Sequence, residues 1–260
     1  MKIYVPHCTQ CSPSEQTILS HSNFLEIEDN LICSKICSNG HETIYHCSHF
    51  KWDLLFQFAV SAIAEGDKRM AILNFASALE EFHKFCIQVL LCSENIDYTT
   101  SRDFLSKHLK LSERQTGGFC LFYFSIFKEA PPHMSNNLIE IRNGVVHTGY
   151  IPNQKKSIEY GEAVRAIIIN TLKKLKENFK EQINEILQKE FLDGFHKVKS
   201  MAEEKNCQFS SYSCQTIINF TTTVFYETDL NQVPLEELVL KLKNTHSYPA
   251  MLNRCMKPVS

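Results

Sequence analysis

The chain is organised around residues 138–150, which have the sequence LIEIRNGVVHTGY. Leu138, Ile141 and Val145 recur at i, i+3 and i+7 and form one apolar stripe, which predicts a half-buried helix. Gly149 is suited to the left-handed position that follows a helix C-terminus, and the proline three residues later forbids continuation. The stretch therefore predicts a helix that carries polar side chains close to its C-terminal end.

Three of those polar side chains are of types that bind phosphate or transfer protons. Arg142 offers a planar fork of donors that suits phosphate oxygens, and His147 supplies an imidazole, the side chain that most often moves a proton in catalysis. Asn143 lies four residues before His147, close enough to fix the orientation of its ring by a hydrogen bond. The alternative interpretation is structural, with the arginine paired to an acid and the histidine stabilised by the helix dipole.

Arg142 and His147 are five residues apart, which is about 140° around an ideal helix. They therefore do not share a face. We expect them to converge only through the reach of the arginine side chain, a distorted last turn, or a second protomer.

Composition limits the class of protein. The chain has 260 residues, of which 43% are hydrophobic and 22% are charged, as in an ordinary globular protein. Its net charge is -2 and its sequence pI is about 6.6, which is not the strongly basic balance of a dedicated duplex binder. We find no apolar run long enough to span a membrane and no apolar signal-type region in residues 1–10, so we expect a cytoplasmic protein with reduced cysteines.

Cysteines are concentrated near the N-terminus and suggest a metal site. Cys8 and Cys11 are separated by two residues, and Cys37 precedes His41 by four. The Asn-Gly pair at 39–40 is typical of a type I′ hairpin turn between two short strands. These features predict a zinc ribbon.

The preferred ligands are Cys8, Cys11, Cys37 and His41. Three thiolates and one imidazole make a closed tetrahedral site, so we predict one structural zinc ion per chain and no catalytic metal. Cys33 and Cys47 are the reserve ligands. The alternative is a small β appendage without metal. A segment of about 45 residues has little core of its own, however, which favours stabilisation by a bound metal ion.

Residues 50–64 are apolar on most faces and predict a buried helix that ends at Gly66. Asp67 is placed to cap a second helix. The apolar stripe of that second helix consists of Ile72, Phe75, Leu79, Phe82, Cys86 and Val89. The very short link predicts that the two helices pack antiparallel. Two shorter helices are expected next, the first from Thr100 or Ser101 and the second from Ser112.

A long helix is predicted from Ser157 to about Glu190. Its apolar stripe consists of Val164, Ile168, Leu172, Leu175, Phe179, Ile183 and Ile186. This helix is longer than one bundle needs, so part of the helix is expected to contact a partner chain. Residues 213–225 then predict a strand or hairpin, and residues 235–243 predict a short helix.

The predicted fold is therefore mainly α, an antiparallel helical bundle with a small N-terminal β zinc ribbon and a short α/β C-terminal extension. The predicted domains are 1–48 for the zinc-ribbon-like segment, 49–192 for the helical domain and 193–260 for the extension.

The run from Arg142 to His147 is similar to the R-x4-6-H signature, with a polar residue straight after the arginine, of the higher-eukaryote-and-prokaryote nucleotide-binding (HEPN) superfamily. Residues 71–82 look like that family's second helix, and residues 146–152 and 160–165 look like the exit of its motif helix and the helix that follows. The resemblance covers about residues 50–190 and does not include the tail.

The resemblance implies a bundle that dimerises and pairs its motifs into a composite site. In the active members this is a metal-independent endoribonuclease that cleaves single-stranded RNA through the ribose 2′-OH. Carried onto this chain, Arg142 would hold the scissile phosphate, His147 would act as general acid–base, and Asn143 would orient the site. Weaker substrate contacts are expected from Glu80, Lys84 and Tyr150.

The implied partners are RNA and a second copy of the chain, with a neutralising or regulatory protein partner as a further candidate and no membrane. The implied setting is a stress response or phage defence. The alternative function is a non-catalytic module of the same type that binds RNA, a nucleotide or a protein.

Overall fold

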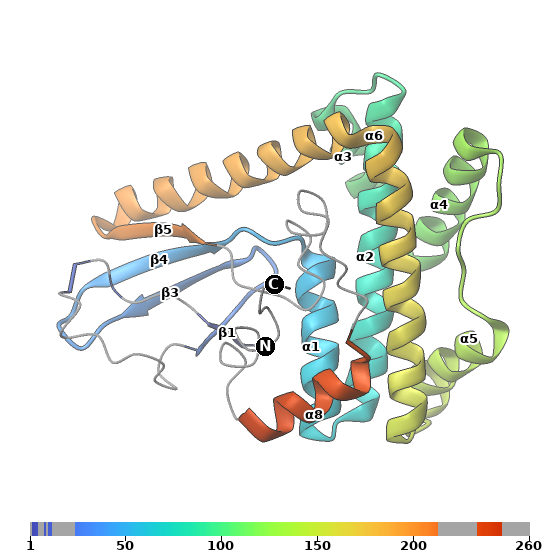
Figure 1. Ribbon diagram of the computed structural model, residues 1–260. Coiled ribbons are helices and arrows are strands. Elements are labelled where there is room, and N and C mark those ends of the chain that lie inside the picture. The colour runs from blue at the N-terminus through green and yellow to red at the C-terminus, as the bar shows by residue number, and fades with distance from the viewer. Residues whose placement is uncertain (1, 5–7, 9, 12–23, 213–232, 246–260) are drawn as a thin grey trace, which may run out of the picture. The chain divides into compact units, whose positions relative to one another are not determined.

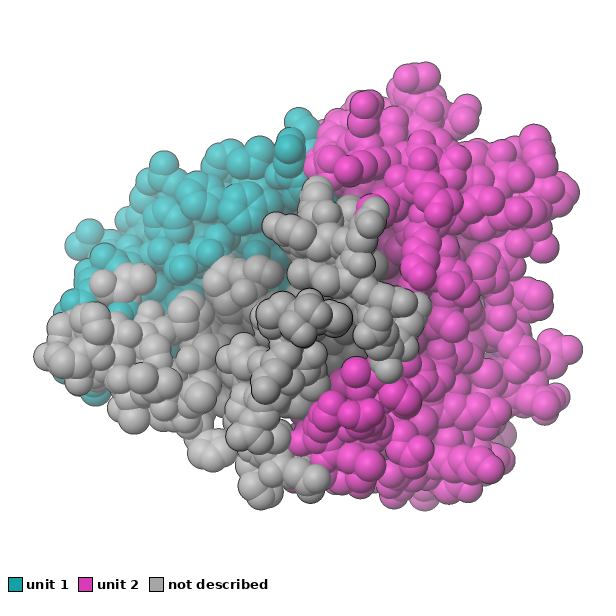
Figure 2. All heavy atoms as spheres, in the orientation of Figure 1, with its two compact units in different colours: residues 1–50, 187–215 teal, residues 51–186, 216–260 magenta. Residues whose placement is uncertain are grey.

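The structure is a computed structural model that describes residues 2–4, 8, 10–11, 24–212 and 233–245 (Figure 1). The chain divides into two compact units, coloured separately in Figure 2. The first unit combines residues 1–50 with residues 187–215, and the second combines 51–186 with 216–260. The described residues are mainly helical with a small sheet, which confirms the predicted class. None of the described helices is both long and apolar enough to cross a membrane.

The first unit contains two small sheets. Strand β1 (Lys2–Tyr4) pairs antiparallel with β2 (Phe24–Glu26). In the second sheet β4 (Glu42–Cys47) is the central strand, antiparallel to β3 (Ile32–Ile36) and parallel to β5 (Gln208–Tyr212). The β3–β4 hairpin was predicted, but β5 comes from the region assigned to a separate extension, and it completes the sheet that the first segment begins.

The β3–β4 turn differs from its predicted type. A type I′ turn needs positive φ at both central residues, but only Gly40 has it, at +80°. The Gly40 N–H donates to the Cys37 carbonyl at 3.0 Å, and the Cys37 N–H donates to the His41 carbonyl at 3.0 Å. This is the arrangement of a turn followed by a left-handed glycine, and the type I′ prediction is wrong.

A helix covers the small sheet. The last part of α6 (Gln154–Lys205) contributes Val198 and Ala202, which pack on Ile32 and Ile44. All four side chains are buried, so the sheet and this part of α6 share one apolar core.

The second unit begins with the predicted antiparallel pair, α1 (Lys51–Glu65) and α2 (Lys68–Ser93). Gly66 has φ +92° in the link, and the Asp67 side chain accepts the N–H of Met70 as the N-cap of α2. The whole predicted stripe of α2 is buried, namely Ile72, Phe75, Leu79, Phe82, Cys86 and Val89. Aromatic side chains join the two helices, with Trp52 edge-on to Phe82 at 5.2 Å between ring centroids.

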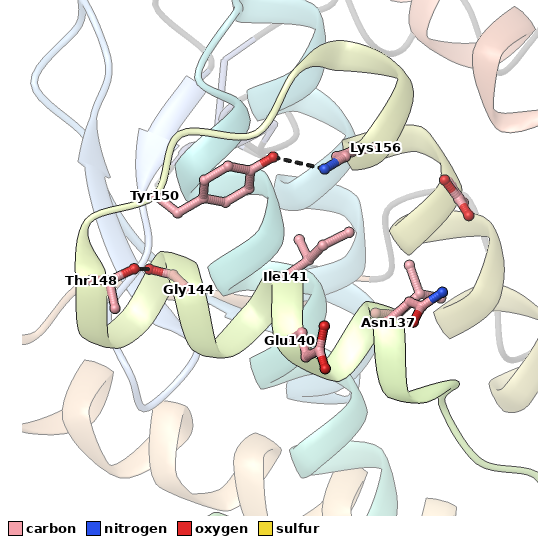
Figure 3. A pocket seen from close by; sticks show the side chains of 9 residues that line it. Asn137, Glu140, Ile141, Gly144, Thr148, Tyr150 and Lys156 are labelled. Atoms are coloured by element: carbon pink, nitrogen blue, oxygen red, sulfur yellow. Dashed lines mark hydrogen bonds between the residues drawn. The ribbon is translucent and has the colours of Figure 1, made fainter.

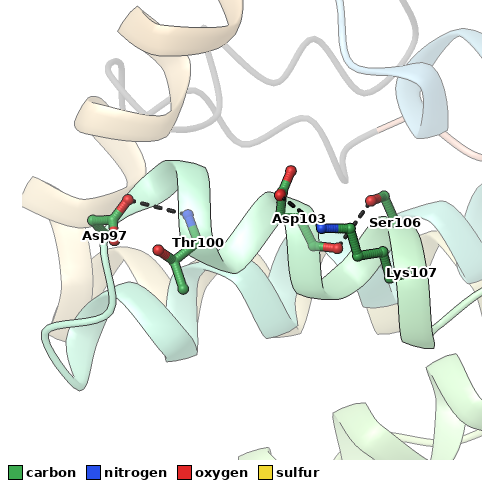
Figure 4. Close-up of polar contacts among 5 residues, drawn as sticks. All are labelled: Asp97, Thr100, Asp103, Ser106 and Lys107. Carbon is green, nitrogen blue, oxygen red and sulfur yellow. Dashed lines mark hydrogen bonds and ion pairs between the residues drawn. The ribbon is translucent and has the colours of Figure 1, made fainter.

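The next helix, α3 (Tyr98–His108), begins two residues before Thr100. The reason is its cap, since the Asp97 carboxylate accepts the backbone N–H groups of Thr99 and Thr100 at 3.0 and 3.1 Å. Figure 4 shows the bond to Thr100. Further along α3, Lys107 and Asp103 form an ion pair at 3.0 Å one turn apart. The helix is therefore capped by Asp97 and begins earlier than Thr100 or Ser101, the residues from which it was expected.

Helix α4 (Ser112–Phe127) begins at the predicted residue. Its buried face includes Phe119, whose ring stacks on His83 of α2 at 4.5 Å between centroids. The Thr116 hydroxyl lies 3.3 Å from His83 Nδ1. Burial lowers the pKa of His83 to about 3, so this imidazole is neutral inside the helical unit.

Helix α6 is longer than predicted, ending at Lys205 rather than near Glu190. Within it Phe179 has a non-helical backbone, with φ -138° and ψ 39°, which marks a kink. The remaining stripe residues are buried within this chain, namely Val164, Ile168, Leu172, Leu175, Ile183 and Ile186. The chain's own core therefore covers these residues, and the expectation that part of the helix serves a partner chain stays a prediction.

The predicted short C-terminal helix is present as α8 (Leu235–Thr245). Buried Arg165 of α6 donates to the Val233 carbonyl at 2.8 Å and pairs with Glu162. The other oxygen of the Glu162 carboxylate accepts the N–H of Leu235, at the first turn of α8. The strand or hairpin predicted at 213–225 lies outside the described residues.

Candidate functional site

The central motif forms α5 (Asn136–Asn143) and a π-helical turn, η3 (Gly144–Thr148). Gly149 has φ +70° and ends the helix as predicted. Leu138 and Val145 of the predicted apolar stripe are buried, and Ile141 is partly buried. The last turn is wider than an α turn, which is the distortion that sequence analysis considered as one route to convergence.

The π turn leaves one backbone carbonyl without its usual partner. The N–H groups of Gly149 and Tyr150 both donate to the Gly144 carbonyl, and the Thr148 hydroxyl donates to the same oxygen at 2.9 Å. In an α-helix the Gly149 N–H would instead serve the Val145 carbonyl. A buried carbonyl without a donor is costly, so another group must supply one.

Arg69 of α2 supplies that donor. Its Nη2 donates to the Val145 carbonyl at 3.1 Å, and its Nε lies 3.4 Å from the same oxygen. Sequence analysis missed this residue because it lies 76 positions before Val145 and belongs to no motif. Only the packing of α2 against the π turn reveals the contact.

Arg142 is brought together with two of the predicted site residues. Its Nη2 donates to the Glu80 carboxylate at 3.1 Å, and its Nη1 donates to the Asn143 side-chain oxygen at 3.2 Å. The two charged side chains are 25% and 28% exposed, so the pair is half-buried. Burial raises the pKa of Glu80, while the Arg142 charge acts in the opposite direction. Three of the five N–H donors of Arg142 have no acceptor among the described residues.

His147 is exposed on the π turn and makes no hydrogen bond or ion pair with any residue that the structure describes. The hydrogen bond predicted between Asn143 and His147 is not formed, because the amide oxygen accepts from Arg142 instead. Arg142 lies in α5 and His147 in the π turn that follows it, and among the described residues no hydrogen bond joins the two side chains.

An open pocket of about 550 Å³ lies beside the motif, between α5, η3 and the start of α6 (Figure 3). Tyr150 packs on Gly144, and a Cβ at that glycine would lie 3.2 Å from the Tyr150 Cβ, which explains a glycine inside the motif. The Lys156 ammonium donates to the Tyr150 hydroxyl at 3.0 Å. Of the other predicted contacts, Lys84 pairs with Glu81 on α2 and does not line this pocket.

The four predicted metal ligands lie together, with their donor atoms within 4.8 Å of one another. The Sγ atoms of Cys11 and Cys37 are 3.7 Å apart. His41 Nδ1 lies 3.7, 3.5 and 3.6 Å from the sulfurs of Cys8, Cys11 and Cys37. The cluster can therefore hold a metal ion. Cys33 and Cys47, the reserve ligands, are not members of it.

The surroundings of the cluster shift the pKa values of two of its thiols in opposite directions. Burial raises the pKa of Cys11 to about 11. At Cys37 burial acts in the same direction, but hydrogen bonds from the backbone of His41 and Asn39 and from the side chains of Cys11 and Cys8 together lower the pKa to about 7. The Asn39 side-chain amide also donates to Cys11 Sγ at 3.4 Å, the kind of outer contact that orients a ligand.

Comparison of the chain with profiles of protein families, with curated proteins and with solved structures gave no match. The relationship to the HEPN superfamily therefore remains a prediction that rests on the motif residues and their helical context.

Proposed function

We propose that this chain is a HEPN-type endoribonuclease that cleaves single-stranded RNA without a catalytic metal. The observation that carries the proposal is the end of α5. There Arg142 keeps three donors that no described residue uses, and the π turn presents an exposed, unbonded His147. A guanidinium for phosphate oxygens and an imidazole for protons are the two groups that such chemistry needs.

The reaction uses a nucleophile that RNA itself contains. The ribose 2′-oxygen attacks the adjacent phosphorus and loses its proton to an imidazole, while the bond from phosphorus to the 5′-oxygen breaks and that oxygen receives a proton. The products are a 2′,3′-cyclic phosphate and a 5′-hydroxyl. Arg142 stabilises the charge that develops on the phosphate oxygens. DNA lacks the 2′-OH and is not a substrate.

Two proton transfers in one reaction are served best by two imidazoles, which supports a composite site in a homodimer. Exposed apolar side chains surround the motif and support pairing at this face. Ile139, Val146 and Ile151 are 43%, 39% and 76% exposed. In a symmetric dimer built on this face, each motif would supply His147 to the other, and the protein would act in a stress response or in phage defence.

The second candidate is a non-catalytic module that binds RNA, a nucleotide or a protein. The ion pair between Arg142 and Glu80 favours it, because it engages part of the guanidinium inside the chain. In that case the motif would be a structural link between α2 and α5, and the exposed histidine would have no role in catalysis.

A cleavage assay in EDTA separates the two candidates. Purified protein is expected to cut single-stranded RNA and leave 2′,3′-cyclic phosphate ends, and Arg142→Ala or His147→Ala should each reduce the rate by at least about 100-fold. Arg114→Ala and His133→Ala are matched controls, since both residues are exposed and lie outside the motif. Unchanged cutting by the motif variants would place catalysis elsewhere, and a folded protein that cuts no RNA would favour the binding module.

The metal cluster fits zinc. With sulfurs about 2.3 Å from the ion, tetrahedral geometry places two sulfurs about 3.8 Å apart, close to the observed 3.7 Å between Cys11 and Cys37. Three cysteines and one histidine fill all four positions, so the zinc ion would be structural. We expect about one zinc ion per chain, which would tie the N-terminal segment to the β3–β4 turn.

A further inference from the structure

The pocket beside the motif has a lining that the cleavage chemistry does not use. Tyr150 and Ile141 supply aromatic and apolar surface, and Gly144 supplies backbone (Figure 3). Glu140 of α5 and Glu159 of α6 supply carboxylates from two different elements. The lining thus combines apolar and polar groups, and its two carboxylates come from different helices.

The charges in this lining decide what kind of group it accepts. Its two carboxylates, Glu140 and Glu159, make no side-chain hydrogen bond with another described residue. The cation in the lining, Lys156, donates to the Tyr150 hydroxyl at 3.0 Å. Acceptors therefore dominate, which disfavours a phosphate and favours a ligand with N–H donors and a flat apolar body.

We propose that this pocket binds an unpaired guanine base of the RNA strand, next to the scissile phosphate. The proposal rests on the function proposed above and adds its base preference. Guanine presents the N1–H and N2–H donors side by side on its Watson–Crick edge, where one carboxylate accepts both. Adenine presents an acceptor at N1, which faces a carboxylate unfavourably, and the pyrimidines leave more of the apolar surface uncovered.

The position of the pocket suits a base that neighbours the reacting phosphate. Ile141, Gly144 and Thr148 line the pocket from the same helix that carries Arg142 and His147, although the two motif side chains are not part of the lining. A base in the pocket and a phosphate at the motif would therefore belong to adjacent parts of one strand. Tyr150 is 36% exposed and can pack against the base, as aromatic side chains do in single-strand recognition.

Binding of free nucleosides tests the pocket without any cleavage. In an NMR titration of the whole protein we expect guanosine to bind about tenfold more tightly than inosine, which lacks the N2 amino group, and adenosine to bind more weakly still. Glu140→Gln or Glu159→Gln should weaken guanosine binding about tenfold. Glu113→Gln, an exposed carboxylate of α4 outside the pocket, is the matched control and should not change it.

Cleavage mapping separates this proposal from the proposed function. Wild-type protein should cut a random-sequence RNA with guanine enriched beside the cut, and the glutamine variant that weakens guanosine binding should lose the enrichment while still cutting. Cutting without guanine enrichment would overturn the pocket proposal and leave the function standing. Guanosine binding without any cutting would support the pocket and defeat the ribonuclease. Resonance shifts in the pocket with spermidine but not with guanosine would show a cation site and overturn the proposal.

Discussion

The metal cluster and the helix end that carries Arg142 and His147 were both predicted from short motifs, but the structure matches the two predictions to different degrees. All four preferred ligands of the cluster, Cys8, Cys11, Cys37 and His41, lie together. The motif helix has its predicted stripe and its predicted end, yet its last turn has another geometry and its amide has another partner. The two sites differ in how far apart in the sequence the residues lie whose contacts determine the local geometry.

In the cluster, one pair of ligands comes from a two-residue spacer and the other from a single hairpin turn, so local geometry fixes most of the site. At the end of α5 the deciding groups approach from α2, with Glu80 pairing with Arg142 and Arg69 donating to the Val145 carbonyl of the π turn. Local spacing contains no information about them. The comparison teaches that a chelating motif is more predictable than the terminus of a helix, whose backbone groups have several competing partners.

The largest effect is expected at the cluster. Cys37→Ser should reduce the zinc content from about one ion per chain to near zero, because a serine hydroxyl is a poor ligand for this ion. Elemental analysis measures the metal, and amide hydrogen exchange should show faster exchange in β3 and β4 with little change in α2. Cys33→Ser is the control, since Cys33 lies in β3 but outside the cluster. Zinc retained in the first variant, or lost in the second, would contradict the ligand set.

An intermediate effect is expected in acid, and it tests the helical unit separately from the cluster. The pKa of His83 is lowered by burial to about 3, below its ordinary value of 6.5, so between these values the unfolded chain binds more protons than the folded one. The free energy of unfolding should therefore fall as the pH falls below 6.5, by up to about 1.4 kcal/mol per pH unit.

His83→Gln removes this titration, so denaturant unfolding of α2 and α4 should depend less on pH between about 6.5 and 4 than in the wild-type protein. Comparison at the same pH cancels the loss of zinc from protonated thiolates, which both proteins share. Equal pH dependence in the two proteins would show that His83 is protonated without cost and would contradict its buried, neutral state.

The smallest effect on stability is expected at the π turn, and it tests whether a distant residue determines the geometry of that turn. Arg69→Met leaves the Val145 carbonyl without its side-chain donor and should lower the free energy of unfolding by about 1 kcal/mol. The turn should then shift towards α-helical bonding, which moves His147, so its imidazole NMR signals should change and the pH profile of RNA cleavage should change with them.

Lys68→Met is the matched control, because it removes a neighbouring cation that contacts only the Gly66 carbonyl among the described residues. If Arg69→Met leaves the His147 signals as they are in the wild-type protein, the π turn is determined locally. The conclusion that a distant residue determines the π turn, whereas local geometry determines the metal cluster, would then be wrong.

Sequence analysis predicted most of the helices because their patterns are long and regular. The stripe of α2 and the Gly66–Asp67 link were confirmed, as was the start of α4 at Ser112. The end of α6 and the third strand were not predicted. An apolar stripe continues at helical spacing after Glu190, through Phe191, Phe195, Val198 and Ala202, so the end of α6 had a signal that the prediction did not follow. What this stripe packs against was not predictable locally, because it is a sheet whose strands come from both ends of the chain.

The sequence by itself determined the helical class, the four candidate metal ligands and the polar groups at the end of α5, because each depends on the spacing of nearby residues. Only the tertiary structure decided the π turn, the ion pair of Arg142 with Glu80 and the parallel strand β5. Each of these depends on contacts with residues more than 60 positions away in the chain, such as Glu80 with Arg142 and Arg69 with Val145. A hydrogen-bonding group takes whichever partner the packed core places beside it, and local spacing does not specify that partner.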